Sequence, residues 1–137
     1  AAGDSLSGIE SVLGSSFDDQ FTLTLGNGWS VDGGAGNDTV HLAAGSGTVT
    51  QAQLSGVLTH VEDIDFTSAS TNASLTVDAS LIQSLVGAGN ASHLTVNFNA
   101  GDSLSIGAGA FYTQSGADYT FYSDASHTTQ IAQLTVG

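Results

Sequence analysis

Short runs in which apolar and polar residues alternate recur from one end of the chain to the other. A period of two places successive side chains on opposite faces of a β-strand. Thr and β-branched residues are common in these runs, and Gly, Asn, Asp and Ser separate them. The pattern predicts a mostly β chain, with short strands at residues 21–25, 63–66, 74–78, 93–98, 103–106, 119–122 and 133–136.

A helical pattern is clear in one segment, residues 78–87. This segment begins with an Asp that can cap a helix, and it ends with a Gly that can terminate one. Leu81, Ile82 and Leu85 fall on one face of such a helix. Residues 50–58 predict a weaker, single helical turn.

One hexapeptide occurs twice in the chain. Ala-Gly-Asp-Ser-Leu-Ser stands at residues 2–7 and again at residues 100–105, and such repetition fits stacked structural units. No linker-like stretch divides the sequence, so we expect a single domain over residues 1–137. A Ser- and Thr-rich seam separates its two expected parts, residues 1–66 and 67–137.

The charge balance excludes several classes of function. The 137 residues include no Lys or Arg and 13 Asp or Glu, which gives a formal net charge of -13. Such a chain cannot neutralise a phosphate backbone, so we expect no nucleic-acid partner. Cys is absent, which excludes disulfides and thiolate metal sites, and no apolar run is long enough to span a bilayer. Because the carboxylates repel one another, an external cation is the simplest compensation.

A nonapeptide at residues 33–41, Gly-Gly-Ala-Gly-Asn-Asp-Thr-Val-His, matches the pattern G-G-x-G-x-D-x-U-x at every defined position. Its glycines permit a tight turn in which carbonyl oxygens face inward, and Asp38 adds a carboxylate to the same concavity. Val40 belongs to the very short strand that follows. Oxygen ligands of this kind suit calcium. The alternative is a glycine-rich turn in which Asp38 is only a solvated turn residue.

One such turn cannot surround an ion, because in a β-roll the ion lies between two turns roughly 18 residues apart. Residues 13–21 form a degenerate copy at about that interval, with Asp19 in the place of Asp38, and residues 25–31 provide an opposite-edge turn. Asn37 is expected to contribute its backbone carbonyl. The predicted calcium ligands are Gly14, Ser16, Asp18, Asp19, Gly33, Ala35, Gly36, Asn37 and Asp38.

Residues 8–42 resemble the repeats-in-toxin calcium-binding family, whose first repeat is often preceded by a phrase similar to Gly-Ile-Glu-Ser-Val. Residues 60–66 resemble the same phrase. Residues 74–136 resemble, less specifically, solenoid segments of large type I-secreted bacterial surface proteins, including adhesins and S-layer-like proteins. The resemblance implies calcium binding outside the cell. This chain departs from the family in having one good nonapeptide instead of a long array.

A second acidic group, Glu62, Asp63 and Asp65, supports two interpretations. It is either a further calcium site or a solvated face. Asp63 and Asp65 would point to one side of a strand, where paired carboxylates can act as acid and base. The chain has no Arg to assist a lyase, so we predict that it is not an enzyme. The late aromatic residues, in segments 111–112 and 119–122, are expected to fill or cap a β core or to stack on sugars.

These features together predict an all-β, right-handed parallel β-solenoid or β-roll with short helical turns, and a β-sandwich is the second alternative. The expected function is that of a secreted, calcium-binding structural protein of a bacterial surface or extracellular matrix. It would act by self-assembly or adhesion, with calcium, further copies of itself and a cell-surface or carbohydrate ligand as partners. The alternatives are a non-catalytic folding and secretion module of a larger extracellular enzyme or toxin, and a small carbohydrate-acting enzyme.

Overall fold

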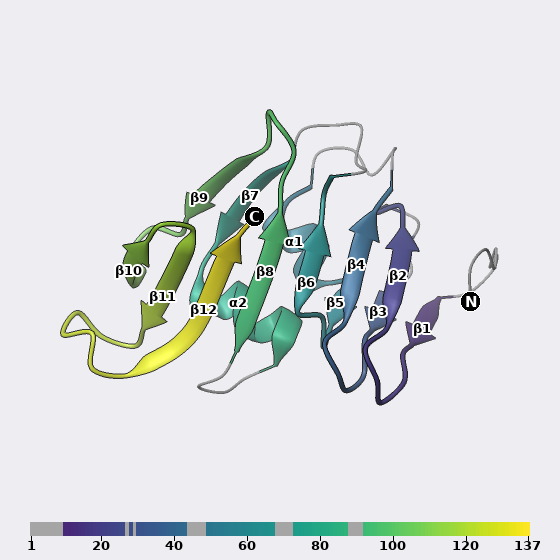
Figure 1. Cartoon of the computed structure of the whole chain (residues 1–137), viewed down its shortest axis with the longest axis horizontal. Coiled ribbons are helices and arrows are strands. Elements are labelled where there is room, and N and C mark those ends of the chain that lie inside the picture. Colours follow the sequence, from purple (N-terminus) through teal and green to yellow (C-terminus); the bar gives the residue numbers. More distant parts are fainter. Residues whose placement is uncertain (1–9, 27, 29, 44–48, 68–72, 88–91) are drawn as a thin grey trace.

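The computed structural model describes residues 10–26, 28, 30–43, 49–67, 73–87 and 92–137 (Figure 1). The first copy of the repeated hexapeptide, residues 2–7, lies outside these residues, and so do parts of the expected opposite-edge turn and of the seam. Of the described residues, 12% are in helices and 44% are in strands.

A seven-stranded sheet forms one layer of the molecule (Figure 1). Five of its strands run parallel, and the two at one end run antiparallel to their neighbours. In spatial order the strands are β10 (Phe111–Ser115), β11 (Asp118–Tyr122), β12 (Gln130–Val136), β8 (His93–Asn97), β6 (Asp63–Asp65), β4 (Thr39–Leu42) and β2 (Gln20–Leu23).

The second layer lies behind this sheet in Figure 1 and combines short strands with helices. A parallel three-stranded sheet contains β1 (Ser11–Leu13), β3 (Ser30–Asp32) and β5 (Leu58–Thr59). A parallel pair contains β7 (Ser74–Val77) and β9 (Ser103–Ile106), and the helices are α1 (Gln51–Ser55) and α2 (Ala79–Val86). From β1 to β6 the chain alternates between the two layers, so all the turns that lead from the β1–β3–β5 sheet to the seven-stranded sheet lie at one edge of the molecule (Figure 1).

The core lies between these layers and follows the alternation of the sequence. In β4 and β8 every second residue is buried, and the residues between them are partly or fully exposed. Val40, Ile64 and Val96 occupy one register position on three neighbouring strands, and each is 0% exposed. The helix expected at residues 78–87 is confirmed as α2, whose buried residues Leu81, Ile82 and Leu85 face the core.

The prediction of an all-β, right-handed parallel β-solenoid is wrong. The chain has mixed sheets in a sandwich-like arrangement, with a share of helix. The difference arises where the two-residue turn Gly116–Ala117 reverses the chain between β10 and β11, since Gly116 adopts a positive φ of 62°. Gly at the first position of such a turn favours an antiparallel hairpin. The chain then reverses again, and β12 lies between β11 and β8.

Most of the late aromatic residues pack at this end of the sheet. Phe121 is buried, and the ring centroids of Tyr112 and Phe121 are 6.0 Å apart, as are those of Tyr112 and Tyr119. Phe111 and Tyr112, both on the outer strand β10, keep substantial exposure. No helix in the described part of the chain has the length and apolar character needed to cross a membrane.

Candidate metal site

Three turns stack on one another where the chain passes from the β1–β3–β5 sheet to the seven-stranded sheet. We call them the first turn (residues 14–19), the second turn (33–38) and the third turn (60–62). The strands before them pair at Leu13, Asp32 and Thr59, and the strands after them pair at Gln20, Thr39 and Asp63. Register therefore makes Gly14, Gly33 and His60 equivalent first residues, and it makes Asp19, Asp38 and Glu62 equivalent last residues.

Carboxylates link each turn to its neighbour through backbone amides. The Asp19 amide donates to Asp38 Oδ1 at 2.8 Å, and the Asp38 amide donates to Glu62 Oε2 at 2.9 Å. The Asn37 amide donates to Asp18 Oδ1 at 2.9 Å. Hydrogen bonds to a charged group are stronger than neutral ones, so these side chains hold the turns in register.

Among the glycines of the first two turns, Gly14 and Gly33 each face a carbonyl oxygen of the following turn so closely that no side chain fits. A Cβ on Gly14 would lie 1.9 Å from the Gly33 carbonyl oxygen and 3.0 Å from Asp19 Oδ2. A Cβ on Gly33 would lie 1.9 Å from the His60 carbonyl oxygen and 2.5 Å from Asp38 Oδ2. In both places a carbonyl from the following turn and a carboxylate oxygen face the same small space.

Asp38 is the most unusual member of this group. It is 0% exposed, and its Oδ2 is a buried oxygen that has no hydrogen-bond partner among the described residues. A buried polar atom left unsatisfied is costly, and a charged one more so. The equivalent oxygen of the first turn, Asp19 Oδ2, accepts a hydrogen bond from the Ser15 amide at 2.6 Å.

The second turn has no such internal bond because another carboxylate takes its amide. The Gly34 amide, the counterpart of the Ser15 amide, donates to Asp32 Oδ1 at 3.2 Å. The same Asp32 oxygen lies 2.7 Å from His60 Nδ1. Asp32 thus joins the second turn to the third and leaves Asp38 Oδ2 without a donor.

The carboxylates at the two ends of the stack are shifted in opposite directions. Hydrogen bonds from the Ser15 amide and hydroxyl lower the pKa of Asp19. Burial raises the pKa of Glu62, and the negative charge of Asp38 adds to this effect. At the third-turn end of the stack, Asp38 and Glu62 thus lie next to one another, and the chain has no Lys or Arg to compensate the two carboxylates.

The structure brings together some of the predicted ligands and separates others. Gly14, Asp19, Gly33 and Asp38 surround the two small spaces, whereas Ser16, Ala35 and Gly36 are exposed along the outer side of the turns, with Asp18 and Asn37. Sequence reasoning did not assign Asp32 or His60 and placed Glu62 in a different cluster. The signal that was available is the strand at residues 63–66, whose start aligns Glu62 with Asp38.

The donor atoms at Asp38 are all oxygens, from carboxylates and a main-chain carbonyl, which is the set that calcium prefers. The residues therefore fit a hard divalent cation. No group of three or more His, Cys, Asp or Glu side chains able to hold a metal occurs among the described residues, so such a site would depend on backbone carbonyls. Calcium binding stays a prediction.

The second acidic group lies on the outer face of the seven-stranded sheet. Asp65 Oδ2 is 2.8 Å from His41 Nδ1, and Asp63 Oδ1 accepts a hydrogen bond from Asn97 Nδ2 at 3.0 Å. Burial and the charge of Asp65 raise the pKa of Asp63. The pKa of Asp65 is lowered, because hydrogen bonds from Thr67 and His41 outweigh its burial. These contacts tie the pair into the sheet surface.

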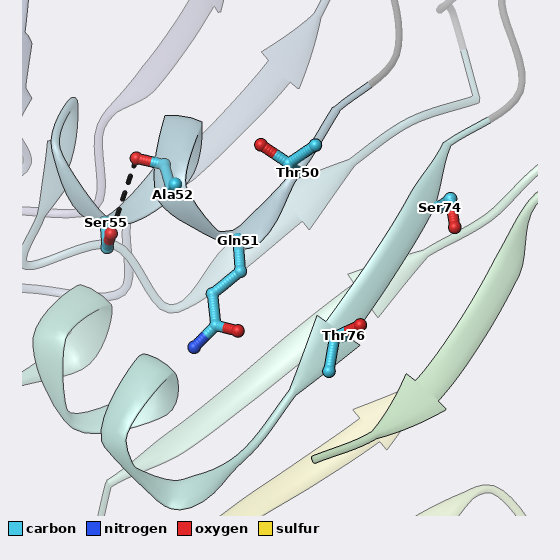
Figure 2. Close-up of a pocket in the computed structure, with 6 residues that line it drawn as sticks. All are labelled: Thr50, Gln51, Ala52, Ser55, Ser74 and Thr76. Carbon is cyan, nitrogen blue, oxygen red and sulfur yellow. Dashed lines mark hydrogen bonds between the residues drawn. The ribbon is translucent and has the colours of Figure 1, made fainter. Parts of the chain in front are cut away.

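A pocket of about 460 Å³ lies elsewhere, between α1 and β7 (Figure 2). Its lining contains hydroxyl and amide groups but no ionisable side chain: Thr50, Gln51, Ala52, Ser55, Ser74 and Thr76.

Comparison of the chain with protein-family models, with curated proteins and with solved structures finds no match. Functional inference therefore rests on the residues themselves.

Proposed function

We propose that the protein is a calcium-binding structural protein in which the ion holds the stacked turns together. The observation that carries the proposal is the Asp38 carboxylate, which is fully buried and has one oxygen that no described residue contacts through a hydrogen bond. The chain has no Lys or Arg that could supply a permanent internal cation for it, and the His60 Nδ1 atom is engaged by Asp32. A divalent metal would supply two positive charges and accept several oxygen ligands at once.

The chain's own residues have separate tasks in this proposal. Gly14 and Gly33 leave room for oxygens that a side chain would displace. The Asp18 and Asp38 carboxylates hold amides of the neighbouring turn and so keep the carbonyls in place. The remaining Asp38 oxygen would bind the ion directly.

Self-association outside the cell is the further part of the proposal, supported by exposed apolar side chains at two places. Leu13 at the end of β1 and Phe17 in the first turn are 73% and 76% exposed, and Phe111 and Tyr112 on the outer strand β10 are 41% and 39% exposed. Outer strands with apolar side chains favour edge-to-edge contact. A net charge of -13 opposes it unless cations screen the copies. The acidic, Cys-free composition and the resemblance to secreted surface proteins support a bacterial surface or matrix location.

The alternative is a calcium-dependent folding module within a longer extracellular protein. In that case neighbouring parts of the same chain would cover the exposed edges, and the isolated module would stay monomeric. A cell-surface or carbohydrate ligand fits either alternative.

The calcium proposal is tested by thermal unfolding and isothermal titration calorimetry with calcium and with chelator. We expect calcium to raise the melting temperature and Asp38→Ala to remove measurable binding. Asp118→Ala is the matched control, because Asp118 lies on exposed β11 and accepts a hydrogen bond from Thr135. Equal calcium affinity in wild type and Asp38→Ala would contradict the proposal.

Self-association is tested by sedimentation velocity across a calcium titration, with magnesium as the control ion. Magnesium requires a strict octahedron and keeps its water, so it should substitute poorly. Calcium-dependent assembly of the chain alone supports the structural protein. A strictly monomeric species at millimolar calcium and high protein concentration would favour the module.

A further inference from the structure

The third turn stacks on the second although it is shorter and its sequence does not match the nonapeptide pattern. It has three residues, His60, Val61 and Glu62, where the second turn has six. Even so, Glu62 aligns with Asp38 in register and accepts the Asp38 amide, as Asp38 accepts the Asp19 amide. The stack therefore continues one turn beyond the recognisable repeats.

The unpartnered oxygen of Asp38 lies on the side of this third turn. Asp38 Oδ1 is directed to the first turn, where it accepts the Asp19 amide. Asp38 Oδ2 and the His60 carbonyl oxygen both lie within 2.5 Å of the position that a Cβ on Gly33 would take. The free carboxylate oxygen and the carbonyl thus share one space between the second and third turns.

Asp32 and the His60 ring keep this arrangement open. Asp32 accepts the Gly34 amide, which would otherwise be the counterpart of the bond that satisfies Asp19. The contact of Asp32 with His60 Nδ1 positions the backbone of the third turn. In the first turn the same oxygen is satisfied within the turn, so the need for a cation is greater at Asp38.

We propose that the third turn completes the cation site at Asp38, with Asp38 Oδ2, the His60 carbonyl oxygen and the Glu62 carboxylate as ligands. This rests on the proposed function, and it moves the site by one turn from the position that the nonapeptide predicts between Asp19 and Asp38. The donors are oxygens only, and the Nδ1 atom of His60 is engaged by Asp32, so the site selects calcium over zinc.

The test is calcium titration by isothermal calorimetry of the full chain and three single variants. Glu62→Gln keeps an oxygen for the Asp38 amide, so it should fold, which circular dichroism checks, and it should weaken calcium binding at least tenfold. Asp63→Asn is the matched control, since its carboxylate faces Asn97 on the sheet surface, and it should bind as wild type does. Asp19→Asn should still bind calcium, because the proposed ligands Asp38, His60 and Glu62 are unchanged in it.

Three results would count against the inference, and the first two separate it from the proposed function. Wild-type binding that Asp19→Asn removes and Glu62→Gln leaves within twofold would overturn the third-turn site while calcium binding stands. Absence of calcium binding in the wild type, at concentrations up to several millimolar, would overturn both. Tenfold tighter binding of zinc than of calcium, lost in a His60→Gln variant, would overturn the assignment of the carbonyl as the His60 ligand.

Discussion

Replacing Asp38 by Asn should change the stability of the protein in opposite directions with and without calcium. The substitution keeps the shape of the side chain and removes its charge. Oδ1 still accepts the Asp19 amide, which lies 2.8 Å away. The new Nδ2 takes the place of the unpartnered oxygen and can donate to the His60 carbonyl, which faces the same space.

Without calcium, the variant should be the more stable form. A buried unsatisfied polar atom costs about 1–3 kcal/mol, and more when it is charged. Because Asp38→Asn satisfies this atom, we expect the free energy of unfolding in chelator to rise by about 1–3 kcal/mol. At about 4 °C per kcal/mol for a chain of this size, the melting temperature should rise by about 4–12 °C.

With calcium, the order should reverse as the ion concentration rises. A site with a dissociation constant of about 10⁻⁴ M adds about 1.4 kcal/mol to the wild type at about 1 mM calcium and about 2.7 kcal/mol at about 10 mM. The variant gains little, because it has lost a charged ligand. The two stability curves should therefore cross at about 1–10 mM calcium.

The measurement is urea or thermal unfolding of both proteins across a calcium series, followed by circular dichroism. Asp118→Asn serves as the control and should follow the wild type at all concentrations, because its carboxylate is exposed. A variant that is less stable than the wild type in chelator would mean that Asp38 Oδ2 has a partner, and the reasoning would fail.

Three further predictions concern packing and pH. Gly33→Ala should destabilise the protein by about 1–3 kcal/mol in urea unfolding, because its methyl group would lie 1.9 Å from the His60 carbonyl oxygen. Gly56→Ala is the control and should be nearly neutral, since the nearest contact of its methyl group is 3.5 Å away. Equal effects of the two substitutions would contradict the close approach at Gly33. Burial and the charge of Asp38 raise the folded-state pKa of Glu62. In chelator, the free energy of unfolding and the melting temperature should therefore increase as the pH falls through that pKa towards the unfolded value of about 4.3. Glu62→Gln should abolish this increase in melting temperature, and an unchanged increase would refute the assignment. The Thr128 hydroxyl and the Ser126 amide hold the pKa of Asp124 below its ordinary value. The stabilising contribution of Asp124 is therefore present above about pH 3.9 and lost as the pH falls through the folded-state pKa. NMR titration of the carboxyl group should show that Thr128→Val raises this pKa, and no change would contradict the contact.

The strands that sequence reasoning located best are those in which one face is more buried than the other. β9 has the expected bounds, and β7 and β8 differ from expectation by one residue at the end, because more buried and less buried residues alternate strictly in all three. β10 was missed because all five of its residues are exposed, so burial leaves no period in its sequence. Parallel and antiparallel strands share a period of two, and alternation therefore could not reveal the reversal at Gly116.

The candidate site was predicted in the part that depends on spacing. Asp19 and Asp38 are equivalent in register, as the interval between the two copies indicated. The third turn was missed because it has a different length, and because its carbonyl belongs to the main chain, which no side-chain pattern marks. The role of Asp32 depends on a contact with His60, 28 residues away, which only the fold creates.

The position of β12 has a consequence for how the sheet is completed. The hairpin of β10 and β11 joins the parallel strands through β12, which pairs with β11 on one side and with β8 on the other. The bond between His93 and Thr135 in that pairing joins residues 42 positions apart, whereas those that link the first two turns join residues 19 apart. During synthesis the first two turns can therefore meet early. The seven-stranded sheet can be completed only after β12, its last strand in the sequence, has left the ribosome. Deleting residues 130–137 would detach the hairpin along with β12 and would leave β8 as the new edge.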